Sequence, residues 1–150
     1  MDILVVVDMQ KDFISGALGT KEALSIVPRV AEKIVQAKKA GKTIVFTRDT
    51  HHENYLDTQE GKNLPVPHCI ENTDGWQIDP ALDTAGAMIF DKPSFGSEAL
   101  VRYLKSLPDL QSAEFVGLCT DICVITNVLS TKCALPELPI SVDSTCCAGV

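Results

Sequence analysis

The feature that most constrains the fold is the continuous apolar run Ile3-Leu4-Val5-Val6-Val7 near the N-terminus. The run is apolar at every position instead of alternating with polar residues, which predicts a strand buried on both faces. Strands of this kind occur in parallel sheets that carry helices on both sides. The chain is therefore expected to fold as an α/β protein.

The segments that follow alternate between helical and strand patterns. Ile26, Val30, Ile34 and Ala37 recur at helical spacing, and this helix is expected to end at Gly41. This alternation predicts a three-layer α/β/α fold with a doubly wound, mostly parallel sheet, in a single domain over residues 1–150. The further expected strands are 43–47, 87–90, 113–117 and 140–143, and the further expected helices are 97–104 and 122–133.

Composition narrows the class of protein. A net charge of −7 argues against a nucleic-acid or anionic-membrane surface, and no apolar stretch approaches the about 20 residues of a membrane span. No basic segment precedes the first apolar run, so no signal peptide is expected. Without one, the 6 cysteines are interpreted as free thiols in a reducing, cytoplasmic location.

Three chemically distinctive side chains, Asp8, Lys92 and Cys123, come just after expected strands. The carboxyl ends of parallel strands share one edge of a sheet, so these residues are expected to meet there. Cys123 opens a helix, whose N-terminus is expected to lower the pKa of the thiol. Taken singly, each has a structural alternative: a buried inert cysteine, a turn-capping aspartate and a solvated lysine.

Together these side chains suit nucleophilic acyl chemistry. Asp8 would act as a general base, and Lys92 would stabilise negative charge. The Cys123 thiolate would attack an acyl carbon to form a thioester, which water would hydrolyse. The backbone N–H groups of Cys119 and Cys123 could hold the oxyanion.

A second group of candidate residues lies in the segment after the second expected strand. Asp49 and His51 form an Asp-x-His pair, and His68 follows Pro67 later in the same segment. Two imidazoles and a carboxylate are a common ligand set for a divalent metal such as Zn, with Fe or Mn as alternatives. The structural alternative is a solvated, histidine-rich loop.

The residues at 6–13, 92–97 and 117–124 resemble three ordered motifs of the isochorismatase-like cysteine hydrolases, and within them the nicotinamidases. The resemblance covers essentially the whole chain. It implies a catalytic triad of Asp8, Lys92 and Cys123 and a cis peptide bond between Leu118 and Cys119. It also implies a homo-oligomer.

The resemblance to nicotinamidases extends to the metal loop, at Asp49, His51 and His68. Many nicotinamidases have a further histidine at the position of Asp57, whereas others use a glutamate that would be Glu60, so the fourth ligand stays open. The other residues that the resemblance implies are Phe13 and Phe95, as aromatic residues of the substrate pocket. Family members are usually longer and add a helix after residues 143–145, so a final helix is expected to be missing from this chain.

The function implied by the resemblance is hydrolysis of nicotinamide to nicotinate and ammonia, in pyridine nucleotide salvage. The alternative within the family is hydrolysis of another small amide, such as a carbamoyl compound. A third interpretation, from a different class, is a thiol-based redox or metal-sensing protein built from Cys119, Cys123 and the Cys146-Cys147 pair.

Overall fold

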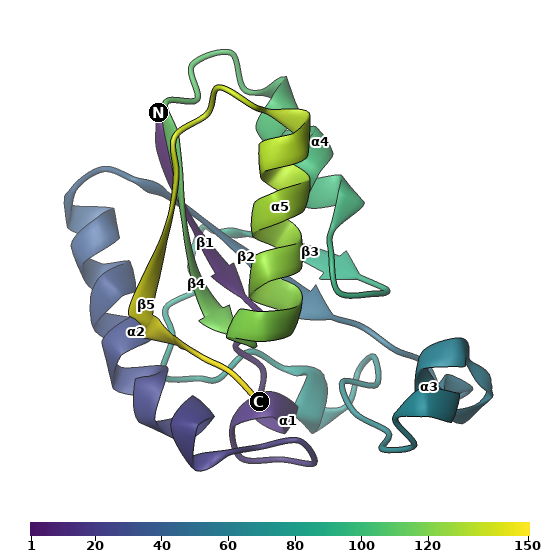
Figure 1. Cartoon of the computed structure of the whole chain (residues 1–150). Coiled ribbons are helices and arrows are strands. Elements are labelled where there is room, and N and C mark those ends of the chain that lie inside the picture. Colours follow the sequence, from purple (N-terminus) through teal and green to yellow (C-terminus); the bar gives the residue numbers. More distant parts are fainter.

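A five-stranded parallel sheet forms the centre of the protein, as the computed structural model of residues 1–150 describes it (Figure 1). The strand order is β3-β2-β1-β4-β5, and every neighbouring pair is parallel. The strands are β1 (Asp2–Val7), β2 (Thr43–Asp49), β3 (Met88–Lys92), β4 (Ser112–Leu118) and β5 (Ile140–Ala148).

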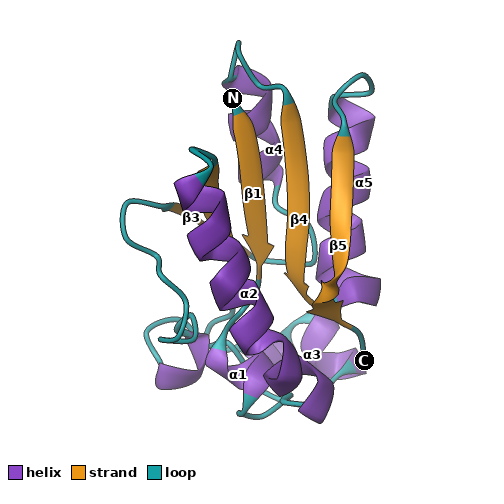
Figure 2. Cartoon of the chain, turned by 90° about the vertical axis from the view of Figure 1, so that its left-hand side faces the viewer, coloured by secondary structure: helices purple, strands orange, loops and turns teal.

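Helices cover both faces of this sheet, which confirms the expected three-layer α/β/α fold. The long helix α2 (Lys21–Lys39) lies on one face, and α4 (Glu98–Ser106) and α5 (Ile125–Ala134) lie on the other (Figure 2). None of the helices is both long and apolar enough to cross a membrane. The shorter elements are α1 (Lys11–Ile14), η1 (Tyr55–Asp57), α3 (Gln59–Asn63), η2 (Asp74–Trp76) and the π-helical turn η3 (Thr120–Val124).

Strand β1 is the centre of the core, as its continuous apolar sequence predicts. Successive side chains of a strand point to opposite faces, so one strand can contribute to two clusters. Leu4 and Val6 belong to the cluster under α2, whereas Ile3, Val5 and Val7 belong to the cluster under α4 and α5. All five are at most 1% exposed.

Several strand boundaries differ from the sequence prediction, including the end of β2 at Asp49. The last strand was expected to end at Asp143, but β5 continues to Ala148 because Cys146, Cys147 and Ala148 are buried against the core. A register shift in β4 between Phe115 and Gly117 accompanies this longer pairing. The third strand extends to Lys92, which is therefore its last residue instead of following it.

Candidate active site and metal-binding cluster

The carboxyl edge of the sheet brings the predicted catalytic residues together. Asp8 directly follows β1, and Lys92 ends β3. Cys123 is held by the turn that follows β4. Gly117 permits this convergence, because it has a φ of +120° and an added Cβ would lie 2.1 Å from the Val7 carbonyl oxygen. Only glycine combines that conformation with so close an approach of β4 to β1.

The three side chains form a continuous, buried contact chain. Lys92 Nζ lies 2.7 Å from Asp8 Oδ2 and 3.4 Å from Cys123 Sγ. Thr47 Oγ1 donates to Asp8 Oδ1 at 2.6 Å, and Lys92 Nζ also donates to the Ser94 carbonyl at 2.9 Å. Asp8 has a left-handed φ of 47°, uncommon for a residue other than glycine. One ammonium therefore connects the carboxylate to the thiol.

The protonation of this group differs from the sequence prediction at Cys123. Burial raises the pKa of Cys123, and the Asp8 carboxylate raises it further, although the charge of Lys92 opposes both. The expected lowering by a helix N-terminus is therefore wrong for the free protein. Burial opposes ionisation of Lys92, but the Asp8 carboxylate raises its pKa above the ordinary value. Lys92 therefore stays charged and the Cys123 thiol stays neutral. The Asp8 carboxylate can take the proton of that thiol.

The segment between β4 and α5 positions the backbone of the two predicted oxyanion residues. The Leu118–Cys119 peptide bond is cis, as the resemblance implies. The Cys119 carbonyl accepts from the N–H groups of Ile122 at 3.1 Å and Val124 at 3.0 Å. The helix expected from residue 122 therefore begins as the π-turn η3, and the oxyanion role of the Cys119 and Cys123 N–H groups stays a prediction.

A second cluster, beside the first, consists of Asp49, His51, Glu60 and His68. One ligand atom from each residue lies within 4.8 Å of the others. His51 Nε2 is 2.9 Å from Asp49 Oδ2 and 3.0 Å from Glu60 Oε2, and His68 Nε2 is 3.4 Å from Asp49 Oδ2. Asp57 is exposed and outside the cluster. Of the two alternatives for the fourth ligand, the structure therefore brings in Glu60.

This cluster fits a divalent metal. The imidazole of His51 can direct its Nε2 hydrogen at only one partner, and it is aligned with Asp49. Glu60 Oε2 is consequently buried without a hydrogen bond. Leaving buried oxygens unsatisfied is costly, and a cation between two carboxylates and two imidazoles would satisfy such oxygens. The donor set is one that zinc, iron or manganese accepts.

Contacts that sequence reasoning missed position Glu60 and the histidines. The Tyr55 ring is buried with its centroid 4.8 Å from that of His51 and 5.1 Å from that of His68. Gly61 lies so close to the Tyr55 backbone that an added Cβ would be 2.0 Å from its carbonyl oxygen. This glycine allows α3 to approach and to place the neighbouring Glu60 over His51.

Two polar residues of the motif after β1 hold the metal loop, and sequence reasoning gave them no role. The Gln10 amide accepts from Asp49 N–H at 2.7 Å and donates to the Asp49 carbonyl at 2.8 Å. Asp12 Oδ2 accepts from the N–H of Cys69, next to His68, at 2.8 Å. The only signal in the sequence is the group of polar residues that follows a buried strand, among them those at 8, 10 and 12.

The two predicted pocket aromatics lie in different surroundings. Phe13 is partly buried, with its ring centroid 5.5 Å from that of His68. Phe95 leaves 45% of its surface exposed. The structure therefore places Phe13 against the metal cluster, whereas Phe95 lies on the surface of the segment that follows Lys92.

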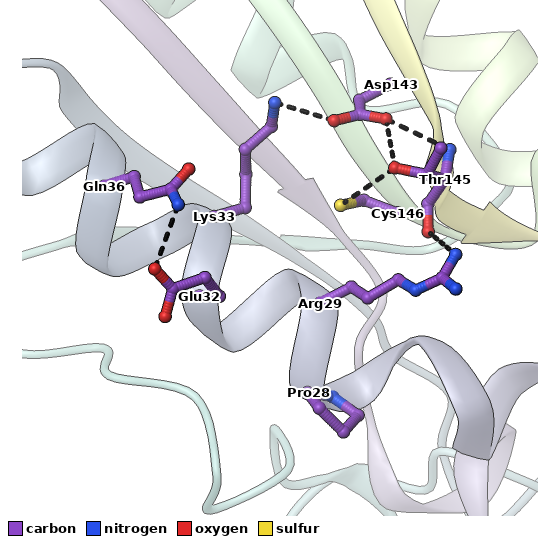
Figure 3. A pocket seen from close by; sticks show the side chains of 8 residues that line it. All are labelled: Pro28, Arg29, Glu32, Lys33, Gln36, Asp143, Thr145 and Cys146. Carbon is purple, nitrogen blue, oxygen red and sulfur yellow. Dashed lines mark hydrogen bonds and ion pairs between the residues drawn. The ribbon is translucent and has the colours of Figure 1, made fainter.

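A separate surface cavity of about 350 Å³ lies between α2 and β5 (Figure 3). It contains none of the predicted catalytic or metal-binding residues. Most of its lining residues are polar, and they include Arg29, Lys33 and Asp143. Because its side chains are remote from the thiol and the metal cluster, we do not assign it to the chemistry of the sheet edge.

Comparisons with known proteins agree with this fold. The family described as Isochorismatase domain matches residues 2–150. The nicotinamidase/pyrazinamidase of Mycobacterium tuberculosis is 26% identical, covering 99% of this chain and 92% of its own length. The pyrazinamidase of Pyrococcus horikoshii, solved in complex with zinc, is 29% identical with a TM-score of 0.85, covering 99% of this chain and 87% of its own. The N-carbamoylsarcosine amidase from Thermoplasma acidophilum shares the fold, with a TM-score of 0.81 at 24% identity, covering 99% of this chain and 84% of its own.

Proposed function

The chain belongs to the isochorismatase family, and from this premise we propose that it is a cysteine-dependent amide hydrolase that converts nicotinamide and water to nicotinate and ammonia. The observation that carries the proposal is the contact of one buried ammonium, Lys92, with both Asp8 and Cys123 beside a four-residue metal cluster. Relatives named nicotinamidase and pyrazinamidase support an aromatic carboxamide as the substrate.

In the first half of the proposed reaction, Asp8 takes the proton of Cys123 as the sulfur attacks the carboxamide carbon. A carbon–sulfur bond forms, and the N–H groups of Cys119 and Cys123 hold the resulting oxyanion. Asp8 then returns the proton to the amide nitrogen. The carbon–nitrogen bond breaks, ammonia leaves, and a thioester remains on Cys123.

In the second half, water attacks the thioester carbon while Asp8 takes one of its protons. The carbon–sulfur bond breaks, and the sulfur regains the proton from Asp8. The product leaves as nicotinate once its carboxyl group has released the second water proton to solvent. The raised pKa of Cys123 suits this cycle, because the thiol stays protonated until the substrate is in place and Asp8 receives the proton. Lys92 keeps its charge throughout and stabilises the negative charge that develops at sulfur.

The metal cluster supports the choice of substrate. Asp49, His51, Glu60 and His68 would hold a divalent cation, for which we propose zinc, with iron and manganese as alternatives. A metal held by these residues would supply a Lewis acid for the ring nitrogen of the substrate. Phe13, packed on His68, would form one wall of the pocket beside that ring.

The test is ammonia release from nicotinamide by the purified, zinc-loaded protein. Cys123→Ala should lower the rate by about 10⁴-fold or more, the order of magnitude for removing a catalytic nucleophile. Cys133→Ala is the matched control, because Cys133 is exposed and outside the site. It should keep wild-type activity, and nicotinate should form in an amount equal to the ammonia.

No release from a folded, zinc-loaded wild-type protein would overturn the choice of nicotinamide. Release from a carbamoyl compound instead, still dependent on Cys123, would favour the alternative amide substrate. Reversible oxidation of Cys123 without turnover of any amide would favour the redox interpretation. Cytoplasmic location and homo-oligomerisation stay predictions.

A further inference from the structure

Asn127 is a buried polar residue that the proposed reaction does not use. It lies in α5, one turn after Cys123, and is 0% exposed. Its Oδ1 accepts from the Ser97 N–H at 2.8 Å, and its Nδ2 donates to the carbonyls of Phe95 at 3.0 Å and Cys123 at 2.8 Å. The amide thus has a backbone partner for each of its polar atoms, and a fully paired buried group holds its partners in one geometry.

The segment that Asn127 binds, residues 93–97, also holds Lys92. This segment connects β3 to α4, and its Ser94 carbonyl accepts from Lys92 Nζ at 2.9 Å. It packs closely on α5, because a Cβ added at Gly96 would lie 3.1 Å from Thr126 Cγ2. Asn127 therefore ties α5 to the loop that fixes the ammonium.

At its other end, Asn127 binds the backbone of the nucleophile. Cys123 lies in η3, where the π-helical turn changes into α5. Such a junction shifts the hydrogen-bond spacing and interrupts the regular backbone ladder. Here the side chains of Thr126 and Asn127 donate to the carbonyls of Ile122 and Cys123, at 2.6 Å and 2.8 Å.

From these contacts we propose that Asn127 is a positioning residue that holds the Lys92 ammonium against the Cys123 sulfur. The inference rests on the proposed function, because it assigns Asn127 to the same reaction. Asn127 reaches both partners through the backbone: Cys123 through its own carbonyl, and Lys92 through the segment that contains Ser94. It touches neither sulfur nor the ammonium, so its loss should impair the chemical step more than substrate binding.

The first test compares Asn127→Leu with Thr131→Val. Thr131 lies one turn further along α5, is also 0% exposed, and has a hydroxyl without a hydrogen-bond partner, so it is a matched control. Asn127→Leu should lower kcat by about tenfold or more and change KM by less than about twofold, as expected when only the reacting geometry is loosened. Thr131→Val should leave both unchanged. An unchanged kcat in Asn127→Leu, or an equal loss in both variants, would overturn the proposal.

Hydrogen exchange gives a readout that needs no substrate. Amides of residues 94–100 should exchange faster in Asn127→Leu than in the wild type, and at the wild-type rate in Thr131→Val. If Asn127→Leu does not fold, Gly96→Ala perturbs the same contact from the opposite side, by pushing the segment away from Thr126. It should likewise lower kcat with little change in KM, and full activity would contradict the proposal.

Alkylation of Cys123 separates this inference from the choice of substrate. Iodoacetamide labelling, measured peptide by peptide, should be slower at Cys123 in Asn127→Leu, because the sulfur loses its ammonium partner, and unchanged at the exposed Cys133. If the wild type hydrolyses no amide, the proposed function fails, but slower labelling at Cys123 alone still supports the positioning role. Equal labelling of Cys123 in both proteins overturns it.

Discussion

Two lysines of this protein each contact two carboxylates, but in very different surroundings. Lys92 Nζ lies 2.7 Å from Asp8 and 3.7 Å from Asp49, and its side chain is 0% exposed. Lys33 Nζ lies 2.8 Å from Glu114 and 2.7 Å from Asp143, and its side chain is 22% exposed; Figure 3 shows its contact with Asp143.

The difference teaches that burial, more than distance, decides what an ion pair can do. The Lys33 group, which consists of Lys33, Glu114 and Asp143, has the shorter contacts overall. Water screens its charges, however, and reduces its contribution to stability. The Lys92 group, which consists of Lys92, Asp8 and Asp49, is buried away from water. Each of its charges is therefore stabilised by its partners instead of by solvent. That dependence is also what makes its ammonium and carboxylate useful for moving a proton and stabilising a thiolate.

The largest expected difference is between Lys92→Met and Lys33→Met. Lys92→Met leaves two buried carboxylates without a cation, so the free energy of unfolding should fall by about 3–5 kcal/mol, and amidase activity should be lost. Lys33→Met removes a partly exposed cation and should cost less than about 1 kcal/mol, with activity retained. Urea unfolding and ammonia release measure both effects.

A double variant tests the reason for this difference. Adding Asp8→Asn to Lys92→Met removes one of the two uncompensated buried charges, and it should recover part of the lost stability without restoring activity. Equal losses of stability in Lys92→Met and Lys33→Met would contradict the assigned role of burial.

A bound metal should increase the difference between the Lys92 and Lys33 groups. Its charge would offset the negative charge of Asp49, whereas the Lys33 group has no comparable cluster. Glu60→Gln should weaken zinc binding by at least about tenfold, which corresponds to about 1.4 kcal/mol. Asp57→Asn is the control, because Asp57 is exposed and outside the cluster. Isothermal titration calorimetry measures both affinities, and equal zinc binding by wild type and Glu60→Gln would exclude Glu60 as a ligand.

Lowering the pH should reveal how much the Lys33 group contributes to the free energy of unfolding. Hydrogen bonds from Lys33 and Thr145 lower the pKa of Asp143 from 3.8 to about 2. The unfolded chain therefore takes up the proton first as the pH falls, so this contribution is present above pH 3.8 and is lost toward pH 2. Because the group is solvent-screened, Asp143→Asn should cost less than about 1 kcal/mol at pH 6 and less still at pH 3, measured by urea unfolding.

The smallest expected effect is that of salt. Raising sodium chloride to about 1 M shortens the screening length to about 3 Å, so the stability cost of Lys33→Met should shrink by a few tenths of a kcal/mol. The cost of Lys92→Met should not change, because solvent ions do not reach a buried pair. A similar salt dependence for both variants would show that water reaches Lys92.

The residues that sequence reasoning placed correctly lie at the ends of strands. Asp8, Lys92 and Cys123 follow or end apolar runs whose sequence pattern predicts parallel strands, and parallel strands bring such positions to one edge. Their contact therefore follows from topology. Asp49, at the end of β2, reaches the same edge for the same reason.

The features that sequence reasoning missed depend on contacts between distant segments. Asn127 acquires its role from a loop 30 residues away in the chain, and Gly61 from its packing on Tyr55. Neither leaves a periodic pattern. The pKa of Cys123 was mispredicted for the same reason, because the helix N-terminus is local to the sequence, whereas burial and the charge of Asp8 arise only in the folded chain.

Asp49 connects the two centres of the site. Its Oδ2 faces the histidines of the metal cluster, and its Oδ1 lies 3.7 Å from Lys92 Nζ. The two centres are therefore not independent parts that evolution or an engineer could exchange separately. Substitutions at Glu60 or the histidines would change the metal preference alone. A substitution of Asp49 would also remove an acidic partner of Lys92.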